Sequence, residues 1–284
     1  MENFTVKNKK LELTVCSKGA EIQSVKINGE QKVWQGGNVW KGKAPLLFPM
    51  AGALKNKKYL HNGKEYEMPF HGFARDLVFE LVSSGEDYLT FRLCDSEYTK
   101  KYFPFAFAFN VTYRIKDTTV SVEYEVINSG DQEMIFSLGS HESYFFNGVL
   151  EDCRIEFEKE EDFLSYIVVD GGLIVEERDD FGKNSKDLQL GGHLFVHDTV
   201  VLGDINSRKV TLYHKEKEFA TITFDAPHLL IWSRGNQPFV CIEPWFNLPD
   251  FNTSNGVLKD KYGILKLGKN ERFTSKHVIA YAEC

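Results

Sequence analysis

Short runs in which apolar and polar residues alternate recur along most of the chain, and turn sequences separate them. Residues 4–15 alternate on both sides of the polar stretch 7–10, a pattern typical of a β-hairpin. The pairs Asn28-Gly29 and Asn62-Gly63 are of the kind that closes tight hairpin turns. We predict further strands over residues 20–27, 32–34, 78–81, 88–93, 105–115, 119–127, 134–138, 200–202, 209–213, 219–224, 229–232, 264–267 and 276–281.

Helical periodicity is almost absent, apart from a turn of helix expected around residues 95–101. The pattern weakens over residues 154–187, where we interpret the acidic run 158–162 as a solvated loop. Roughly eighteen strands are more than an immunoglobulin-sized unit holds. With no linker and no internal repeat in the sequence, we expect one domain, residues 1–284, of all-β class, built as a large antiparallel β-sandwich.

Composition narrows the class of protein further. The chain has 284 residues, 42% of them hydrophobic, and a net charge of −7 with acidic and basic residues interspersed. A nucleic-acid partner is not expected, because that needs a basic stripe. No signal peptide or membrane span is expected either, and the five scattered cysteines suit reduced thiols, so we predict a cytoplasmic protein.

The first candidate for chemistry is Glu243, which follows the apolar run 239–242 and precedes Pro244. We interpret the run as a short buried strand that the proline closes, which would place the carboxylate at the rim of a sheet. Partial burial would raise its pKa toward the range useful for proton transfer. An ordinary salt bridge is the alternative.

Two histidines have a similar setting. His71 is followed by Gly72 and, four residues on, by Arg75, so that a loop can offer a hydrogen-bond donor and a cation. His141 comes after an apolar strand and Gly139, and imidazole is suited to donating a proton at neutral pH. Each could instead be a structural histidine. Asp198 is a further candidate, as an acceptor for sugar hydroxyls, although it could equally be a turn residue.

Other chemistries are less well supported by the sequence. The GxSxG motif of a nucleophile elbow and a glycine-rich phosphate loop are both missing. His71, His141 and Glu243 could form a metal site, but no HxH or HExxH spacing arranges them. Aromatic residues that could wall a sugar site, or simply pack in the core, are Phe73, Tyr144, Trp232 and Trp245.

The motifs, taken in order, resemble those of the aldose 1-epimerase (galactose mutarotase) superfamily, most closely its LacX-like branch. They are Leu47-Phe48-Pro49 with Gly52, then residues 68–75 (MPFHGFAR), Gly139-Ser140-His141, Ile231-Trp232-Ser233 and residues 241–245 (CIEPW). The resemblance spans nearly the whole chain.

This resemblance implies a large antiparallel β-sandwich that interconverts the α and β anomers of free sugars without a metal or organic cofactor. It implies Glu243 as the general base at the C1 hydroxyl and His141 as the general acid at the ring oxygen. His71 is then the second histidine near that oxygen. Substrate-binding roles are expected for Arg75, Asp198 and Trp232, with a small-molecule sugar as the partner.

Two positions depart from the family pattern. Ala53 stands where many relatives have an arginine, so that Arg75 or Lys55 would have to supply the cation. Glu142 stands where this branch often has proline, and it would raise the pKa of His141 only if it turned inward. A non-catalytic carbohydrate-binding or sensing protein and a hexose-phosphate mutarotase, with Arg234 as a further cation, remain as alternatives. The sequence does not predict the oligomeric state.

Overall fold

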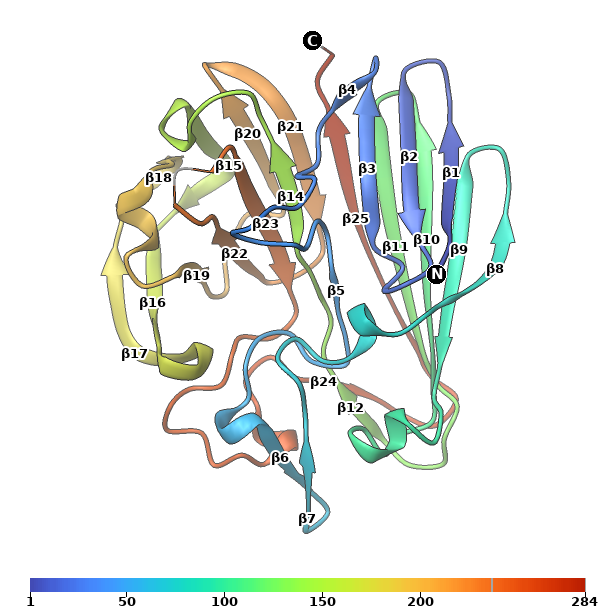
Figure 1. Ribbon diagram of the computed structural model, residues 1–284. Helices are drawn as coiled ribbons and strands as arrows, with labels where there is room; N and C mark the ends of the chain where they lie inside the picture. Colours follow the sequence, from blue (N-terminus) through green and yellow to red (C-terminus); the bar gives the residue numbers. More distant parts are fainter. Residues whose placement is uncertain (236, 284) are drawn as a thin grey trace.

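A long, regular sheet and a short-stranded one pack against each other in the computed structural model, which describes residues 1–235 and 237–283 (Figure 1). Every pair of neighbouring strands in these sheets is antiparallel. The larger sheet has nine strands, in the order β18 (Ser185–Gln189), β15 (Cys153–Glu161), β20 (Lys209–His214), β21 (Lys217–Phe224), β25 (Arg272–Tyr281), β11 (Thr119–Asn128), β10 (Phe107–Lys116), β9 (Tyr88–Cys94) and β8 (Glu80–Ser84).

The centre of the larger sheet follows directly from the alternation in the sequence. Strands β10 and β11 pair over ten residues each, and the turn between them passes through Asp117, which has a positive φ of 51°. Buried positions such as Val111, Val120 and Val122 face the core, while residues such as Thr112 and Glu123 on the other face are partly exposed. The strands predicted over residues 105–115 and 119–127 are confirmed, and they form a hairpin.

The second sheet is built from shorter pieces. Its order is β19 (Thr199–Leu202), β22 (His228–Trp232), β23 (Phe239–Trp245), β13 (Gly139–Ser140) and β5 (Leu46–Leu47), with β14 (Glu142–Phe145) also paired to β23. Both faces of β23 are buried. Val240 and Ile242 belong to the main core, whereas Phe239 and Cys241 pack with Trp232 on the other face.

The remaining elements pack around these two sheets, and the four-stranded one lies against β9 and β10 (Figure 1). A four-stranded sheet contains β1 (Asn3–Lys7), β2 (Leu11–Cys16), β3 (Ile22–Ile27) and β4 (Glu30–Gln31). Three strand pairs are β12 (Met134–Phe136) with β24 (Leu265–Leu267), β16 (Leu164–Val169) with β17 (Leu173–Asp180), and β6 (Lys58–His61) with β7 (Lys64–Glu67). The 3-10 turns are η1 (Lys55–Lys57), η2 (Ala74–Asp76), η3 (Thr99–Lys101), η4 (Leu150–Asp152), η5 (Asp170–Gly172), η6 (Gly192–Phe195) and η7 (Leu258–Asp260).

One main cluster of buried apolar residues joins the four-stranded sheet, the nine-stranded sheet and the inner face of the six-stranded sheet. The predicted class, a large antiparallel β-sandwich, is therefore confirmed. Cys16, Cys94, Cys153 and Cys241 carry free thiols, as expected, and Cys284 lies outside the described residues. Among those residues, no helix is long and apolar enough to cross a membrane.

Three expectations about local structure were wrong. Residues 32–34 are not a strand, since β4 ends at Gln31. The acidic run 158–162 is mostly the end of β15, not a loop, and its Glu161 is only 4% exposed. The Glu161 carboxylate accepts backbone N–H groups from Asn206 and Ser207, at 3.1 and 2.6 Å, so a buried charge ends this strand. The strand count also exceeds the expected eighteen: 25 strands lie within the described residues, several of them only two or three residues long.

Candidate active site

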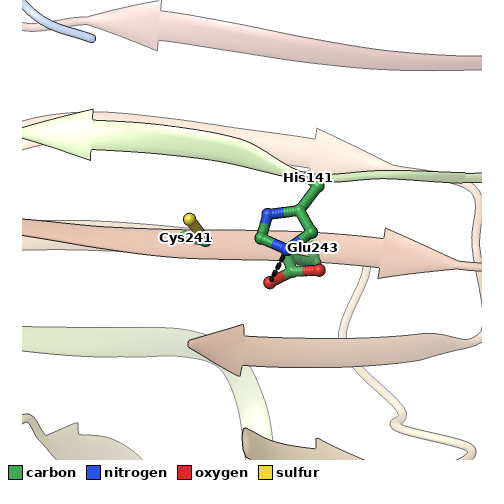
Figure 2. A group of neighbouring side chains, drawn as sticks. All are labelled: His141, Cys241 and Glu243. Carbon is green, nitrogen blue, oxygen red and sulfur yellow. Dashed lines mark ion pairs between the residues drawn. The ribbon is translucent and has the colours of Figure 1, made fainter. Parts of the chain in front are cut away.

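Strand register places His141 and Glu243 opposite each other. Gly139 pairs with Trp245 and Glu142 pairs with Ile242, so the same register runs through the short gap between β13 and β14. Side chains opposite each other on an antiparallel pair lie on one face. Figure 2 shows the His141 ring directed at Glu243, and the Nε2 atom lies 3.3 Å from a carboxylate oxygen.

The expected position of Glu243 at the rim of a sheet was wrong. Strand β23 continues through Pro244 to Trp245 and lies between β22 and the β13/β14 pair, so Glu243 is only 1% exposed. Proline is tolerated inside this strand because Pro244 lies opposite Ser140, where the ladder between β23 and the β13/β14 side is interrupted between the pairs Gly139–Trp245 and Glu142–Ile242. The carboxyl group is therefore held in the middle of a sheet.

Burial works against the charge on both members of the pair. Burial raises the pKa of Glu243 well above its usual value, and the negative charges of Glu142 and Asp198 raise it further. Burial lowers the pKa of His141 to about 4, against a smaller opposing effect of Glu142. Burial thus favours the neutral form of both groups, which is protonated Glu243 and deprotonated His141.

His71 projects into the same region from the loop before η2. Its φ is 67°, and the φ of Gly72 is 73°. A Cβ at Gly72 would lie 2.3 Å from the Phe48 carbonyl oxygen, so only glycine fits this turn. The backbone N–H of Gly52 donates to Nδ1 of His71 at 3.1 Å. Burial lowers the pKa of His71 well below its usual value. The neutral ring must therefore carry its proton on Nε2, as a hydrogen-bond donor.

All six residues singled out by the sequence line one cavity of about 250 Å³. They are His71, Arg75, His141, Asp198, Trp232 and Glu243. Trp245 also lines it, with its ring centroid 5.4 Å from that of His71. Phe73 and Tyr144, expected as possible walls, belong instead to the main core, because their strands and loop turn them away from the cavity.

Sequence reasoning missed two aromatic walls, Trp40 and Phe70. Trp40 comes from the loop between β4 and β5 and stacks on His141, with ring centroids 5.1 Å apart and an interplanar angle of 25°. Phe70 packs on His71, with ring centroids 3.9 Å apart, and also lines the cavity. The sequence signal for Trp40 is a tryptophan among the glycines of residues 36–42, and the sequence does not show which residue it covers.

The cations around Ala53 can now be placed. Ala53 is buried, and Arg75 lines the cavity, with its side chain 34% exposed and its Nε 3.8 Å from Asp76. Lys55 is directed elsewhere, since its Nζ donates to the Ser254 carbonyl at 3.1 Å. Arg234 is a second arginine in the cavity lining. Of the two cations considered in place of the missing arginine, Arg75 therefore lines the cavity and Lys55 does not.

His141, Cys241 and Glu243 offer atoms of the kind that bind metals, all within 4.8 Å of one another (Figure 2). Burial raises the pKa of the Cys241 thiol well above its usual value, and the Glu243 and Glu142 carboxylates add to this. A protonated thiol is a poor ligand, because thiolate is the form that binds metal. In the protonated state that burial favours, Cys241 is a small buried apolar residue that packs with Trp232 and Phe239.

Comparisons with known proteins agree with the fold and the motifs. The sequence profile of the aldose 1-epimerase family matches residues 2–259. The chain is 30% identical to the plasmid-encoded protein LacX of Lactococcus lactis, over 92% of this chain and 93% of that protein. The structure of a galactose mutarotase related enzyme from Lactobacillus acidophilus is similar, with a TM-score of 0.91, 30% identity and coverage of 99% and 97% of the two chains. A putative glucose-6-phosphate 1-epimerase of Escherichia coli is 23% identical over 86% of this chain and 82% of its own.

Proposed function

The chain belongs to the aldose 1-epimerase family, and on that premise we propose that it interconverts the α and β anomers of a free aldose, as a cofactor-independent mutarotase of one domain. The observation that carries the proposal is the 3.3 Å contact between His141 and Glu243 in the wall of the cavity. An acid and a base side by side, both shielded from water, are what opening and closing a sugar ring requires.

One proton on the His141–Glu243 pair is enough for the whole cycle. Burial favours the proton on Glu243. Once it passes to His141 across the 3.3 Å contact, the Glu243 carboxylate takes the proton of the C1 hydroxyl while His141 protonates the ring oxygen. The bond from C1 to the ring oxygen breaks, and the aldehyde forms. After rotation about C1–C2, His141 takes its proton back, the ring oxygen attacks the other face of C1, and Glu243 returns its proton to the new hydroxyl. The pair regains its starting state, so no other proton carrier is needed.

Neighbouring residues hold the sugar for this exchange. The Nε2–H of His71 donates toward the ring oxygen, because its Nδ1 is occupied by Gly52. Trp232 and Trp245 provide apolar surface for a pyranose face. Asp198 and Arg75 offer an acceptor and a donor for hydroxyl groups at the cavity wall.

A hexose phosphate is the second candidate substrate, and a specific observation favours it. Two arginines, Arg75 and Arg234, line the cavity, and arginine is well suited to binding phosphate. The Escherichia coli relative is named for glucose 6-phosphate.

Exchange of magnetisation between the α and β anomeric protons, measured by NMR on glucose, galactose and glucose 6-phosphate, tests the proposal. We expect exchange above the buffer rate for at least one sugar. Faster exchange of glucose 6-phosphate but not of glucose would select the hexose phosphate as the substrate. Binding seen by calorimetry without faster exchange for any sugar would instead identify a carbohydrate-binding or sensing protein.

A further inference from the structure

Behind the catalytic pair lies a second pair of ionisable residues, in the core of the sandwich. Glu142 follows His141 in the chain, so its side chain leaves the opposite face of the strand. Its Oε1 lies 3.1 Å from Nε2 of His277 on β25, and the two residues are only 4% and 3% exposed. Glu142 thus turns neither into the cavity nor to solvent.

Stability alone does not explain this pair. Removing an acid and an imidazole from water is costly, and apolar residues of similar size are often as stabilising or more so. The pair is also part of a larger set, because the Tyr124 hydroxyl lies 3.3 Å from Nδ1 of His277. The ring of His277 is therefore held between a carboxylate and a phenol, which fixes its orientation.

The other titratable groups that feel the charge of Glu142 come from several strands around it. Tyr113, Tyr124, Tyr144 and Tyr281 are buried phenols, and burial raises the pKa of each, so they stay neutral. Cys241 and Glu243 on β23 complete the set with His277. Further out on β25, Lys276 lies 3.0 Å from Glu123, and Asp225 accepts the Lys276 N–H.

Glu142 keeps its charge in this apolar setting. Burial alone would raise its pKa, but His277 and Ser140 outweigh burial, and the pKa of Glu142 lies below its usual value. The resulting negative charge raises the pKa of Glu243 and of His141. It therefore acts on both partners in the same direction, in favour of holding a proton.

Resting on the proposed function, we propose that Glu142 and His277 are positioning residues for the anomer exchange. They hold His141 on the cavity face of its strand and set a fixed negative charge behind it, which keeps one proton on the His141–Glu243 pair. Neither residue touches the sugar.

Glu142→Gln tests this proposal through the pH profile of kcat/KM for the exchanged sugar. Without the charge, His141 and Glu243 lose protons more readily, so both limbs of the profile are expected to move to lower pH by about one unit. Glu142→Asp keeps the charge, and its limbs are expected to stay in place even where kcat falls. If Glu142→Gln does not fold, the double variant Glu142→Gln/His277→Gln replaces it, since two amides can bond across the same gap, and the same shift is expected.

Glu161→Gln is the matched control. Glu161 is also a glutamate with 4% exposure, but it lies at the end of β15 and binds backbone N–H groups. This variant is expected to lower the melting temperature without moving the profile. Unmoved limbs in Glu142→Gln, or a move to higher pH, would overturn the proposal and leave Glu142 a purely structural residue.

A readout without turnover separates this proposal from the proposed function. The infrared band of a protonated carboxyl group that disappears in Glu243→Gln reports on Glu243 directly. In Glu142→Gln this band is expected to titrate away at lower pH than in the wild type, and an unchanged titration contradicts the pair's role. A wild-type protein that exchanges no sugar would refute the proposed function, whereas the infrared test would still decide the coupling.

Discussion

The nine-stranded and six-stranded sheets share antiparallel strand geometry but have different roles, one in stability and one in forming the site. In the larger sheet, β10 and β11 pair without interruption over ten residues, and alternate side chains fill the core. In the smaller sheet, β13 has two residues and β14 has four, and the gap between them presents His141 to Glu243. Regular pairing thus supplies stability, while the interrupted sheet carries buried ionisable groups whose burial costs free energy.

Glu243→Gln tests the smaller sheet's part in this comparison and has the largest expected effect. The amide fits the same space but cannot take up a proton, so the anomer exchange rate should fall by about 10²- to 10⁴-fold. The melting temperature should stay the same or rise, because a buried acid is replaced by a neutral group. NMR exchange and thermal unfolding on the same sample check both outcomes. A fall in rate accompanied by loss of folded protein would contradict the separation of stability and catalysis between the two sheets.

Phe91→Ala tests the larger sheet's part. Phe91 in β9 is fully buried and packs edge-on against Phe4 and Tyr113. Its truncation should lower the free energy of unfolding by about 3–5 kcal/mol. The exchange rate per folded molecule should remain that of the wild type. Urea unfolding with activity normalised to the folded fraction is the measurement, and a rate loss beyond that fraction would show that the two sheets are not separable.

The pH dependence of stability separates the two regions further. A pKa of about 4 in the folded protein, against 6.5 for free histidine, means that acidification favours the unfolded state through His141. The free energy of unfolding is expected to fall by roughly 3 kcal/mol through this residue as the pH falls from 6.5 to 4. His141→Gln should remove that loss, and Glu161→Gln should not. The pH dependence that comes from Glu243 has the opposite sign. Its pKa is raised in the folded protein, so this residue stabilises the fold at low pH. The contribution is lost as the pH rises above the pKa that Glu243 has in the unfolded chain. Equal acid sensitivity of wild type and His141→Gln by urea unfolding would refute this assignment.

Trp40→Ala should have the smallest effect. The indole stacked on His141 stabilises the imidazolium through its π face, a contribution of about 1 kcal/mol. We expect the exchange rate to fall by roughly 3- to 10-fold, with little change in melting temperature. Trp40→Phe keeps an aromatic ring there and should retain most of the rate. Equal losses in both variants would mean that the stacking does not contribute.

The same contrast explains what the sequence could reveal. The hairpin over residues 105–127 was predictable because alternation and a turn are local signals. Convergence of His71, His141 and Glu243 was predictable only through the family motifs, since the three are far apart in the chain. The direction of Glu142 and the stacking of Trp40 depend on strand register and on loop packing, which no local pattern encodes. Pro244 gave a wrong prediction for the same reason: a proline usually closes a strand, but an interruption of the pairing opposite this one accommodates it.

A double-mutant cycle shows whether His141 and Glu243 act as one proton-transfer unit. Anomer exchange by NMR is compared in the wild type, His141→Gln, Glu243→Gln and the double variant, at equal concentrations of folded protein. Residues that act as a unit show strongly non-additive losses. We expect the double variant to be about as slow as the slower single variant. Two losses that multiply would contradict it, because each residue would then contribute independently of the other.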